Sequence, residues 1–480
     1  MGRLELESQF SSELSPRVKT LNSFAAERGL GSPIIRVAPT GIAAFNINGS
    51  TLHETFSIPT KCFSKLNNAQ ELQLQKRLKD CKYIILDEKS MVGRRMLGYL
   101  DNRLRVAFPE KSNEMFGGCS LLMFGDFGQL PPVGDTALFN LTHYDESSNK
   151  NIDSNYGRSV YMNGINESIT LNRVMRQQGD SPTAIRFREV LSCVQSKEAT
   201  EADCEFLNTR CIQNLSPEER SKFLDDGDTL YLCPRNAQVS QINDSKMAAS
   251  GNPVVVIPAR HTGRGASKAS DDEAEGLVPK LKLMEGAKVM LTRNIWTKQG
   301  LTNGSTGTIR IALRQIETNM SDKIIFTPEQ TPHRDVPAVI MVKMPCYKGP
   351  TLWYAEDGTP IVPLVPFTVR WHQKNGIPCS RTQYPLRIAY AVTIHKSQGM
   401  TLNKAIVEPG DRDDSRGQLF VALSRVRRVE DLALRSLIDV ERVNKGAPSG
   451  RDYLQEDNIR RAHMGFTDPD DAEEFEVWFR

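Results

Sequence analysis

The sequence predicts an α/β fold in which a parallel sheet carries polar residues along one edge. Two short apolar runs, Tyr83 to Leu86 and Cys119 to Phe124, have the composition of strands buried on both faces. A third run, Ile34 to Ala38, turns through Pro39-Thr40-Gly41 into an expected helix. Strands that alternate with helices in this way are typical of a parallel sheet.

Two adjacent carboxylates, Asp87 and Glu88, follow the first apolar run. Ligands of open α/β sheets bind at the carboxyl ends of the strands, so this position favours a site for a metal and a water. The first carboxylate can hold Mg²⁺ on a phosphate, and the second can orient or deprotonate an attacking water. A surface turn is the alternative interpretation of such a short motif.

The sequence GDFGQLPP, residues 125 to 132, follows the second apolar run. A polar side chain just past a strand end, held by glycines and a rigid Pro-Pro, can touch a terminal phosphate and respond to its loss. Gln129 is therefore the candidate phosphate sensor. An ordinary loop is the alternative, but two neighbouring strands that both end in phosphate-type chemistry favour a functional site.

Composition sets the broad class. A chain of 480 residues exceeds one ordinary core, so roughly two to four domains are expected. A hydrophobic content of 39% and a charged content of 25% are those of a soluble globular protein. The formal net charge of +3 is mild, so a nucleic-acid site would have to be a local basic lining.

Cysteine usage and the first residues bear on the compartment. Nine cysteines without a C-x-x-C pair fit neither a disulfide framework nor a zinc site, which favours reduced thiols in an intracellular compartment. No apolar run approaches the roughly 18 residues that span a bilayer. The first residues, MGRLELESQF, resemble neither a signal peptide, a transit peptide nor a myristoylation signal.

Further along, apolar spacing predicts helices over 183–224, and Thr229 to Pro234 is expected to be a buried strand that opens a new domain. Residues 263–276 are polar and of low complexity, which predicts a mobile surface loop. The helical period is lost over 312–381, where β-rich pieces follow one another. A strand over Arg387 to Ala391 then returns the chain to the α/β pattern.

Six blocks occur in a fixed order between about residue 34 and residue 440: APTGIAAFNINGSTLHETF, ILDEKSM, GDFGQLPPV, LNRVMRQ, AVTIHKSQGMTL and FVALSRVRR. Together they resemble the ordered motifs of the PIF family of RecD-like, superfamily-one DNA helicases, which has relatives of the Helitron type. Order over so much of the chain is far more specific than any single short motif. The resemblance implies two RecA-like domains of the P-loop NTPase class, with ATP between them and single-stranded DNA across their tops.

The resemblance also implies domain boundaries. The first RecA-like domain would occupy 1–225 with a wedge-like insertion at 57–80, and the second would occupy 226–311 with 382–445. Residues 312–381 would form an inserted β-barrel and 446–480 a peripheral tail.

The hydrolysis residues implied by the resemblance fall on the strand ends and on two arginines. Asp87 would hold Mg²⁺, Glu88 would position water, Gln129 would sense the γ-phosphate, and Arg176 with Arg425 would offset the charge that develops in phosphoryl transfer. The usual alternative for an arginine is a surface salt bridge. The expected ATP contacts are Gly125, Asp126, Gln129, Arg176, Gly399 and Arg425.

The DNA contacts implied by the resemblance lie in the first and fifth blocks: Pro39, Thr40, His53, Thr393, His395, Lys396, Ser397 and Gln398. A strand-end turn that leads to a helix amino terminus offers N–H groups to a phosphate, and closely spaced donors of several kinds suit a phosphodiester backbone. The alternatives are a buried, satisfied histidine at 53 and an ordinary capped helix start at 397. Four aromatic or imidazole side chains could stack on bases or pack in a core: Trp353, Tyr354, Trp371 and His372.

One family element is not found in the sequence. A phosphate-binding loop ending in Gly-Lys-Ser/Thr should precede the helix expected over Ser15 to Arg28, because its N–H groups cradle the phosphates. The chain instead reads SQFSSELSPRVK, with no glycine between Gly2 and Gly29. We therefore expect either a truncated copy of an active protein or a chain that keeps DNA binding without ATP turnover.

The function expected from the resemblance is that of a DNA helicase. It would couple hydrolysis of Mg²⁺-bound ATP to 5′-to-3′ translocation on single-stranded DNA and to duplex unwinding, in repair, recombination, telomere maintenance or mobile-element replication. Its expected partners are single-stranded and forked DNA and no membrane. The expected state is a monomer in the nucleus, or in the mitochondrion. A single-strand binding module on the same surface is the alternative.

Overall fold

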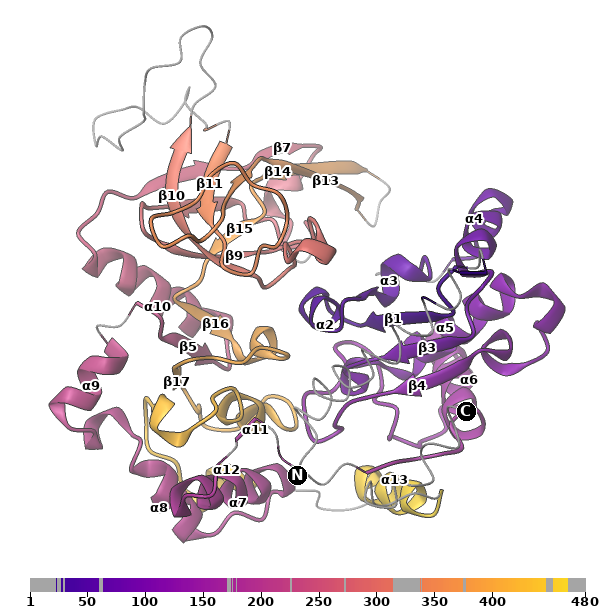
Figure 1. Ribbon diagram of the computed structural model, residues 1–480, viewed down its shortest axis with the longest axis horizontal. Helices are drawn as coiled ribbons and strands as arrows, with labels where there is room; N and C mark the ends of the chain where they lie inside the picture. The colour runs from indigo at the N-terminus through magenta and orange to yellow at the C-terminus, as the bar shows by residue number, and fades with distance from the viewer. Residues whose placement is uncertain are drawn as a thin grey trace, which may run out of the picture. The chain divides into compact units, whose positions relative to one another are not determined.

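The computed structural model describes residues 23, 27–28, 31–59, 64–170, 174, 176–177, 179–224, 227–271, 273–313, 337, 339–373, 377–445 and 452–464. The chain forms two compact units (Figure 1). The first unit combines Met1–Asp228 with Gln398–Arg480, and the second is Thr229–Ser397. The helix expected over Ser15 to Arg28 lies largely outside the described residues.

The first unit contains the predicted parallel sheet. Its strands are β1 (Ile34–Ala38), β2 (Ser50–Thr51), β3 (Tyr83–Leu86) and β4 (Ser120–Met123), in the order β2-β1-β3-β4. Every pair is parallel, and Leu86 lies beside both Val37 and Met123. The three long strands therefore end at the same level, so the polar residues that follow β1, β3 and β4 share one edge of the sheet.

Short helices start where the sequence offers capping residues. Thr40 caps α2 (Gly41–Asn46) and Thr51 caps α3 (Leu52–Thr55), each through its hydroxyl oxygen. Asn67 and Gln70 form a capping box at the start of α4 (Asn68–Leu78), inside the segment expected to be a wedge-like insertion.

Longer helices supply the apolar core of the first unit. Leu97, Leu100 and Leu104 lie on one face of α5 (Arg94–Ala107) and pack with Ile84 of β3 in one cluster. Val160 and Tyr161 of α6 (Asn149–Gly164) belong to the same cluster. This core fixes the strands whose ends carry the polar residues.

The remaining elements of the first unit come from both parts of the chain. The helices predicted over 183–224 are confirmed as α7 (Pro182–Ser196), α8 (Glu201–Asn208) and α9 (Pro217–Leu224). Residues after Gln398 add the parallel pair β17 (Ala405–Val407) and β18 (Leu432–Leu434), with α11 (Gln418–Leu423), α12 (Val440–Asn444) and α13 (Tyr453–Ala462).

The second unit joins a small α/β part to an antiparallel β-rich part. The α/β part contains β5 (Leu230–Cys233), α10 (Asn236–Ala249) and β16 (Ala391–Thr393), with β16 parallel to β5. One antiparallel sheet, β12-β11-β10-β9-β15, contains β9 (Lys288–Leu291), β10 (Thr306–Leu313), β11 (Val339–Lys343), β12 (Ile361–Leu364) and β15 (Leu386–Ile388). A second antiparallel sheet contains β13 (Phe367–His372), β14 (Pro378–Gln383) and β7 (Arg260–Thr262), in that order. A third is the pair β6 (Val255–Pro258) and β8 (Lys280–Leu283).

Two sequence predictions in the second unit are wrong. The segment 263–276 is not a loose surface loop, because Ala266 and Ala274 are fully buried and pack against Trp371. The buried guanidinium of Arg381 donates hydrogen bonds to backbone carbonyls of this segment, including that of Ala269. The single strand expected over 387–391 is instead divided between β15 and β16.

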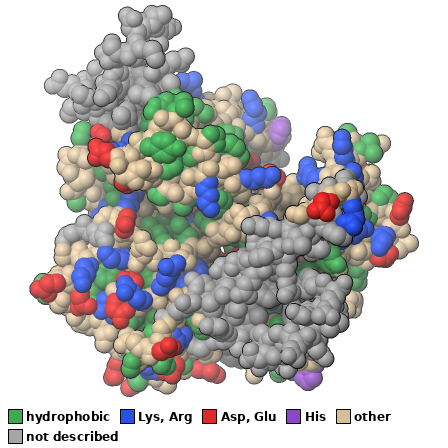
Figure 2. Space-filling view, viewed as in Figure 1, with side chains coloured by type: hydrophobic (Ala, Val, Ile, Leu, Met, Phe, Trp, Pro, Cys, Tyr) green, Lys and Arg blue, Asp and Glu red, His purple; other side chains and the backbone are tan. Residues whose placement is uncertain are grey.

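The four side chains that could stack on bases are in different surroundings. Trp371 is 7% exposed and belongs to the core, as its alternative interpretation held. Trp353 and Tyr354 are 50% and 61% exposed. Figure 2 shows hydrophobic side chains gathered on the surface of the β-rich part of the second unit. Stacking therefore stays a prediction for these two, and His372 is exposed at the end of β13.

Helix α13 lies in the tail that was expected to be peripheral, yet it is built into the first unit. Leu454 belongs to the main core cluster, and Asp457 is fully buried. The Asp457 carboxylate accepts hydrogen bonds from the hydroxyl of Tyr161 at 3.0 Å, from Arg461 at 2.8 Å and from Arg460 at 2.8 Å. The Arg461 guanidinium also lies 5.3 Å from the ring centre of Phe127, next to Gly128 and Gln129.

No helix in the described residues is both long and apolar enough to cross a membrane.

The Asp457→Ala substitution should lower the free energy of unfolding by about 3–5 kcal/mol, because it leaves the buried guanidinium of Arg461 and the partly buried one of Arg460 without their carboxylate. Guanidinium chloride unfolding would measure the loss. Asp431→Ala is the matched control, since its ion pair with Arg428 is exposed on the arginine side and should change stability by less than about 1 kcal/mol. Equal losses in the two variants would contradict a structural role for the buried pair.

Candidate active site

Glu88 is held at the end of β3 in an unusual backbone conformation. Its φ is 55°, in the left-handed region, and its side chain is 7% exposed. The N–H of Glu88 donates to Oδ1 of Asp87 at 2.9 Å, and the next N–H, of Lys89, donates to the carbonyl of Phe124 after β4 at 2.8 Å. These bonds maintain a conformation that is rare for a residue other than glycine, and such outliers cluster at functional sites.

The loop after β4 brings Gln129 to the same place. Gly125 has a φ of 135°, and a Cβ there would lie 2.6 Å from the N atom of Lys89, so the close approach of the two loops requires glycine. Both carboxylate oxygens of Asp126 hold the loop, one accepting from the N–H of Gly128 at 2.9 Å and the other from the amide of Gln195 at 2.5 Å. Gln129 is 1% exposed.

Gln398 connects these two loops. Its Nε2 lies 3.1 Å from Oε2 of Glu88, 3.3 Å from Oγ of Ser90 and 3.3 Å from Oε1 of Gln129. Gly399 follows with a φ of 78°, and a Cβ there would lie 3.7 Å from Oε1 of Glu88. The sequence placed Gln398 among the DNA contacts, whereas its hydrogen bonds in the structure join it to the predicted hydrolysis residues Glu88 and Gln129.

The two predicted arginines are buried near these side chains. Arg176 donates from Nη1 to the carbonyl of Ser424 at 3.1 Å. Arg425 is fully buried and donates to the carbonyl of Val421 at 2.7 Å and to that of Met400 at 3.3 Å. Neither arginine forms a surface salt bridge, which was the alternative interpretation, because both are buried.

The pKa values of the charged groups show how strongly burial acts here. Burial raises the pKa of Glu88, while the hydrogen bond from Gln398 and the charges of Arg425 and Arg176 lower it. Burial and the charge of Glu88 raise the pKa of Asp87 from 3.8 to about 7. Burial, together with the neighbouring Arg176, holds the pKa of Arg425 well below its usual value, although the charge of Glu88 opposes this.

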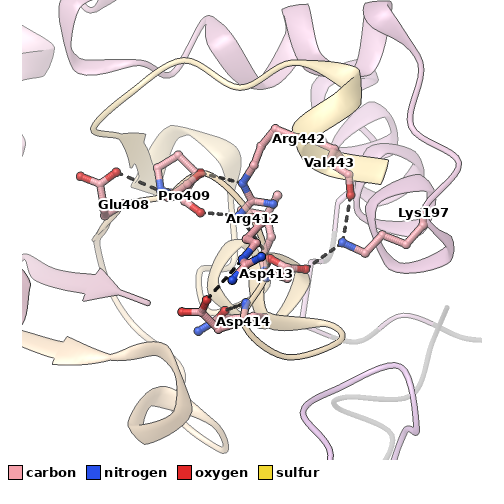
Figure 3. A network of polar contacts seen from close by, with 11 residues as sticks. Lys197, Glu408, Pro409, Arg412, Asp413, Asp414, Arg442 and Val443 are labelled. Atoms are coloured by element: carbon pink, nitrogen blue, oxygen red, sulfur yellow. Dashed lines mark hydrogen bonds and ion pairs between the residues drawn. The ribbon is translucent and has the colours of Figure 1, made fainter. Parts of the chain in front are cut away.

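A buried ion-pair network fixes the loop that precedes α11 and Arg425 (Figure 3). The Asp413 carboxylate accepts from Nζ of Lys197 at 2.7 Å, from Arg442 at 3.2 Å and from the N–H of Leu419 at 3.2 Å. Lys197 also donates to the carbonyl of Val443 at 2.9 Å, and Arg442 donates to that of Gly410 at 2.7 Å. The network therefore joins the end of α7, the start of α11 and α12.

Gly417 links this braced loop to the Gln129 loop. Its φ is 74°, and a Cβ there would lie 2.3 Å from the carbonyl oxygen of Gly128. Both the backbone conformation and the close contact require glycine. Gly128 is itself closely packed, since a Cβ there would lie 2.2 Å from Nε2 of Gln195.

The expected DNA contacts are divided between the two units. Thr40 uses its hydroxyl to cap α2, and His53 lies half-buried in α3, where burial lowers its pKa. In the second unit, Ser397 is fully buried and donates to the carbonyl of Ile394 at 2.8 Å. Four other expected contacts are partly exposed: Pro39, Thr393, His395 and Lys396.

A magnesium ion fits the chemistry of Asp87 but would need further ligands. Among the described side chains, no group of three or more His, Cys, Asp or Glu could hold a metal alone. Magnesium commonly binds one or two carboxylates together with waters and substrate phosphates. The half-buried Asp87 at the sheet edge therefore suits an ion that arrives with a nucleotide.

Sequence reasoning found the strand-end carboxylates, the glutamine and the arginines, and the structure brings all of these into the first unit. It did not assign Gln398 to them, and it gave no role to Gln195, Lys197, Asp413 or Gly417. These residues are far from Glu88 in the sequence and have no motif of their own. For Asp413, the one sequence signal that could have pointed to it is the charged run DRDD, residues 411 to 414.

A parallel sheet whose strand ends carry Asp87-Glu88 and Gln129, with two arginines nearby, defines the RecA-like class of nucleotide-hydrolysing proteins. Comparisons with known proteins show what the chain is similar to. Residues 21–195 match the model of the PIF1-like helicases, and residues 273–311 match that of the 2B domain of the DNA helicase Pif1. These two segments of the chain are therefore similar to PIF1-like helicases.

Individual proteins are similar over most of the chain. The chain is 25% identical to the ATP-dependent DNA helicase Pif1 of Psychrobacter sp., over 95% of this chain and 69% of that protein. It is 29% identical to the ATP-dependent DNA helicase PIF1 of Danio rerio, over 86% of this chain but only 56% of that protein. The crystal structure of a Bacteroides Pif1 helicase in complex with ADP-AlF3 and single-stranded DNA superimposes with a TM-score of 0.63 at 25% identity, over 90% of this chain and 88% of that one.

The Gly417→Ala substitution should lower the melting temperature and displace the Gln129 loop, because the added Cβ meets the Gly128 carbonyl. We expect a loss of about 2 kcal/mol or more in the free energy of unfolding. Gly134→Ala is the control, since Gly134 also has a positive φ of 68° but has no atom within 4 Å of an added Cβ. It should lose only about 1 kcal/mol from backbone strain. Equal losses would contradict the close contact.

The raised pKa of Asp87 predicts a pH dependence of stability without nucleotide or metal. The folded chain binds the Asp87 proton more tightly than the unfolded chain, so this group's contribution to stability falls as the pH rises from about 4 to about 7. Asp87→Asn should therefore raise the free energy of unfolding by about 1–3 kcal/mol at pH 8 and change it little at pH 4. Thermal unfolding at the two pH values would measure this, and a destabilised variant at pH 8 would contradict it.

Proposed function

We propose that this chain is an ATP-dependent DNA helicase whose hydrolysis site is built around Glu88. The matches to the models of the PIF1-like helicases and of the Pif1 2B domain support ATP hydrolysis. The observation that carries the assignment to residues is the buried cluster in which Gln398 lies within hydrogen-bonding distance of both Glu88 and Gln129. A carboxylate and an amide held together in this way suit an attacking water beside a terminal phosphate.

Each of these residues then has a distinct task. Glu88 orients the attacking water and takes its proton, and Gln129 donates a hydrogen bond to the terminal phosphate. Arg176 and Arg425 stabilise the negative charge that spreads over the phosphoryl oxygens in the transition state. Asp87 would hold Mg²⁺, which when bound neutralises charge on the nucleotide phosphates.

Single-stranded DNA is the proposed track. The Bacteroides relative was crystallised with single-stranded DNA, and another Pif1 structure with a similar fold describes unwinding at forked duplex DNA. The proposed contacts are Pro39, Thr40, His53, Thr393, His395, Lys396 and Ser397. Gln398, which the sequence also placed among the DNA contacts, instead belongs to the buried cluster with Glu88. Opening and closing of domains would step the strand in the 5′-to-3′ direction.

The wider role is proposed from the family alone. The helicase would act on single-stranded and forked DNA as a monomer in the nucleus, or in the mitochondrion. Repair, recombination, telomere maintenance and mobile-element replication are the processes that such an activity would serve. The proposed domain boundaries are those expected from the sequence.

A second function has a specific observation in its favour. The sequence contains no Gly-Lys-Ser/Thr, which the phosphates of ATP normally require. In that alternative the chain binds single-stranded DNA without ATP turnover. The two functions differ in one measurable property, which is DNA-stimulated hydrolysis.

The deciding experiment is ATP hydrolysis by this chain with and without a single-stranded oligonucleotide, beside Glu88→Gln. Stimulated turnover in the unsubstituted chain that falls about 100-fold or more in the variant would support the proposal, because the amide cannot take a proton from water. Oligonucleotide binding should be unchanged in both. Glu110→Gln is the control, because Glu110 is exposed and lies away from the strand ends. Absence of turnover in the unsubstituted chain, with DNA binding retained, would favour the alternative.

A further inference from the structure

Gln398 contacts the proposed hydrolysis residues, but the proposed mechanism assigns it no task of its own. It is 6% exposed, and its amide nitrogen lies within 3.3 Å of acceptor atoms on Glu88, Ser90 and Gln129. These acceptors come from loops that follow two different strands. One amide therefore holds together the two loops that carry the hydrolysis residues.

The orientation of this amide follows from the charge beside it. The N–H₂ of Gln398 donates to Oε2 of Glu88, so the oxygen of Gln398 points elsewhere. Gln129 in turn must present its oxygen to the same N–H₂, which directs its own Nε2 away from Gln398. The orientation of Gln129 is thus set by Glu88 through Gln398.

Two atoms remain after these bonds are made. Within the described part of the chain, no hydrogen-bond partner is found for Nε2 of Gln129 or for Oε1 of Gln398, although both atoms are buried. Buried polar atoms without a partner are rare in folded proteins and indicate a bound group. The pair consists of one donor and one acceptor. A phosphoryl oxygen can accept from the first, and a water molecule can donate to the second.

We propose that Gln398 is a positioning residue of the hydrolysis site, which turns the N–H₂ of Gln129 toward the terminal phosphate and fixes the Glu88 carboxylate for the attacking water. The inference rests on the proposed ATP hydrolysis and extends it by one residue. The left-handed turn at Gly399 supports it, because this turn brings the chain back beside Glu88 directly after Gln398.

The test is steady-state ATP hydrolysis at saturating single-stranded oligonucleotide for Gln398→Met and Gln398→Glu. Both variants keep the approximate size of the side chain. Met cannot donate a hydrogen bond, and Glu, buried beside Glu88, would share a proton with it and so change the charge and geometry of that carboxylate. We expect kcat to fall roughly 10- to 100-fold, because misplaced catalytic groups cost rate, while KM for ATP changes less than about threefold. A role in packing alone would leave kcat unchanged in at least one of these variants, and that result would overturn the proposal.

Asn46→Ala is the matched control. Its amide donates to the carbonyl of Gly399 at 3.2 Å, so it supports the same loop, but the side chain is exposed and touches none of the hydrolysis residues. We expect wild-type kcat. An equal fall of kcat in this control would mean that general loosening of the loop, and not the Gln398 amide, explains the loss.

A second measurement does not depend on turnover. Melting temperatures of Gln398→Met, Gln129→Met and the double variant should not add, since the second substitution removes a contact that the first has already broken. Additive shifts would overturn the proposal. If the unsubstituted chain hydrolyses no ATP, the proposed function fails, and the additivity of the melting temperatures still decides whether Gln398 orients Gln129.

Discussion

The architecture of the first unit depends on the groups that surround the buried carboxylate of Glu88. Glu88 is almost inaccessible to water, and burial alone would drive its side chain to the neutral form. The nearby charges of Arg176 and Arg425 and the amide of Gln398 act in the opposite direction. Removing any one of these groups would leave a buried charge undercompensated, which is why residues from distant parts of the chain have to meet at this point.

The surrounding fold supplies the necessary precision. Parallel strands of matched register bring Glu88 and Gln129 to one edge of the sheet, and Gly125 lets their loops touch. The buried Lys197–Asp413–Arg442 network anchors the start of α11, and Arg425 lies just after the end of this helix. The unit therefore combines rigid strands with a braced loop, and such support from neighbouring residues keeps functional groups in a productive geometry.

Several features of this region reduce stability when no ligand is present. Asp87 and Glu88 repel each other, Glu88 has a strained backbone, and the pKa of Arg425 is depressed by burial and by Arg176. A nucleotide with a metal ion would offset these costs, because phosphate suits the arginines and a cation suits Asp87. Strained backbone and strongly shifted pKa values cluster at functional sites, so these destabilising features agree with a hydrolysis site.

The sequence alone determined the chemistry at the strand ends. Short apolar runs followed by Asp87-Glu88 and by Gln129 predicted a parallel α/β sheet and its polar edge, because side-chain hydrophobicity and turn residues act locally. It did not reveal which distant groups complete the site. The assignment of Gln398 to Glu88, the contact of Gly417 with Gly128, and the burial of Asp457 in a tail expected to be peripheral all depend on contacts between residues far apart in the chain. Such contacts are decided by the packing of the whole unit, and local patterns do not encode them.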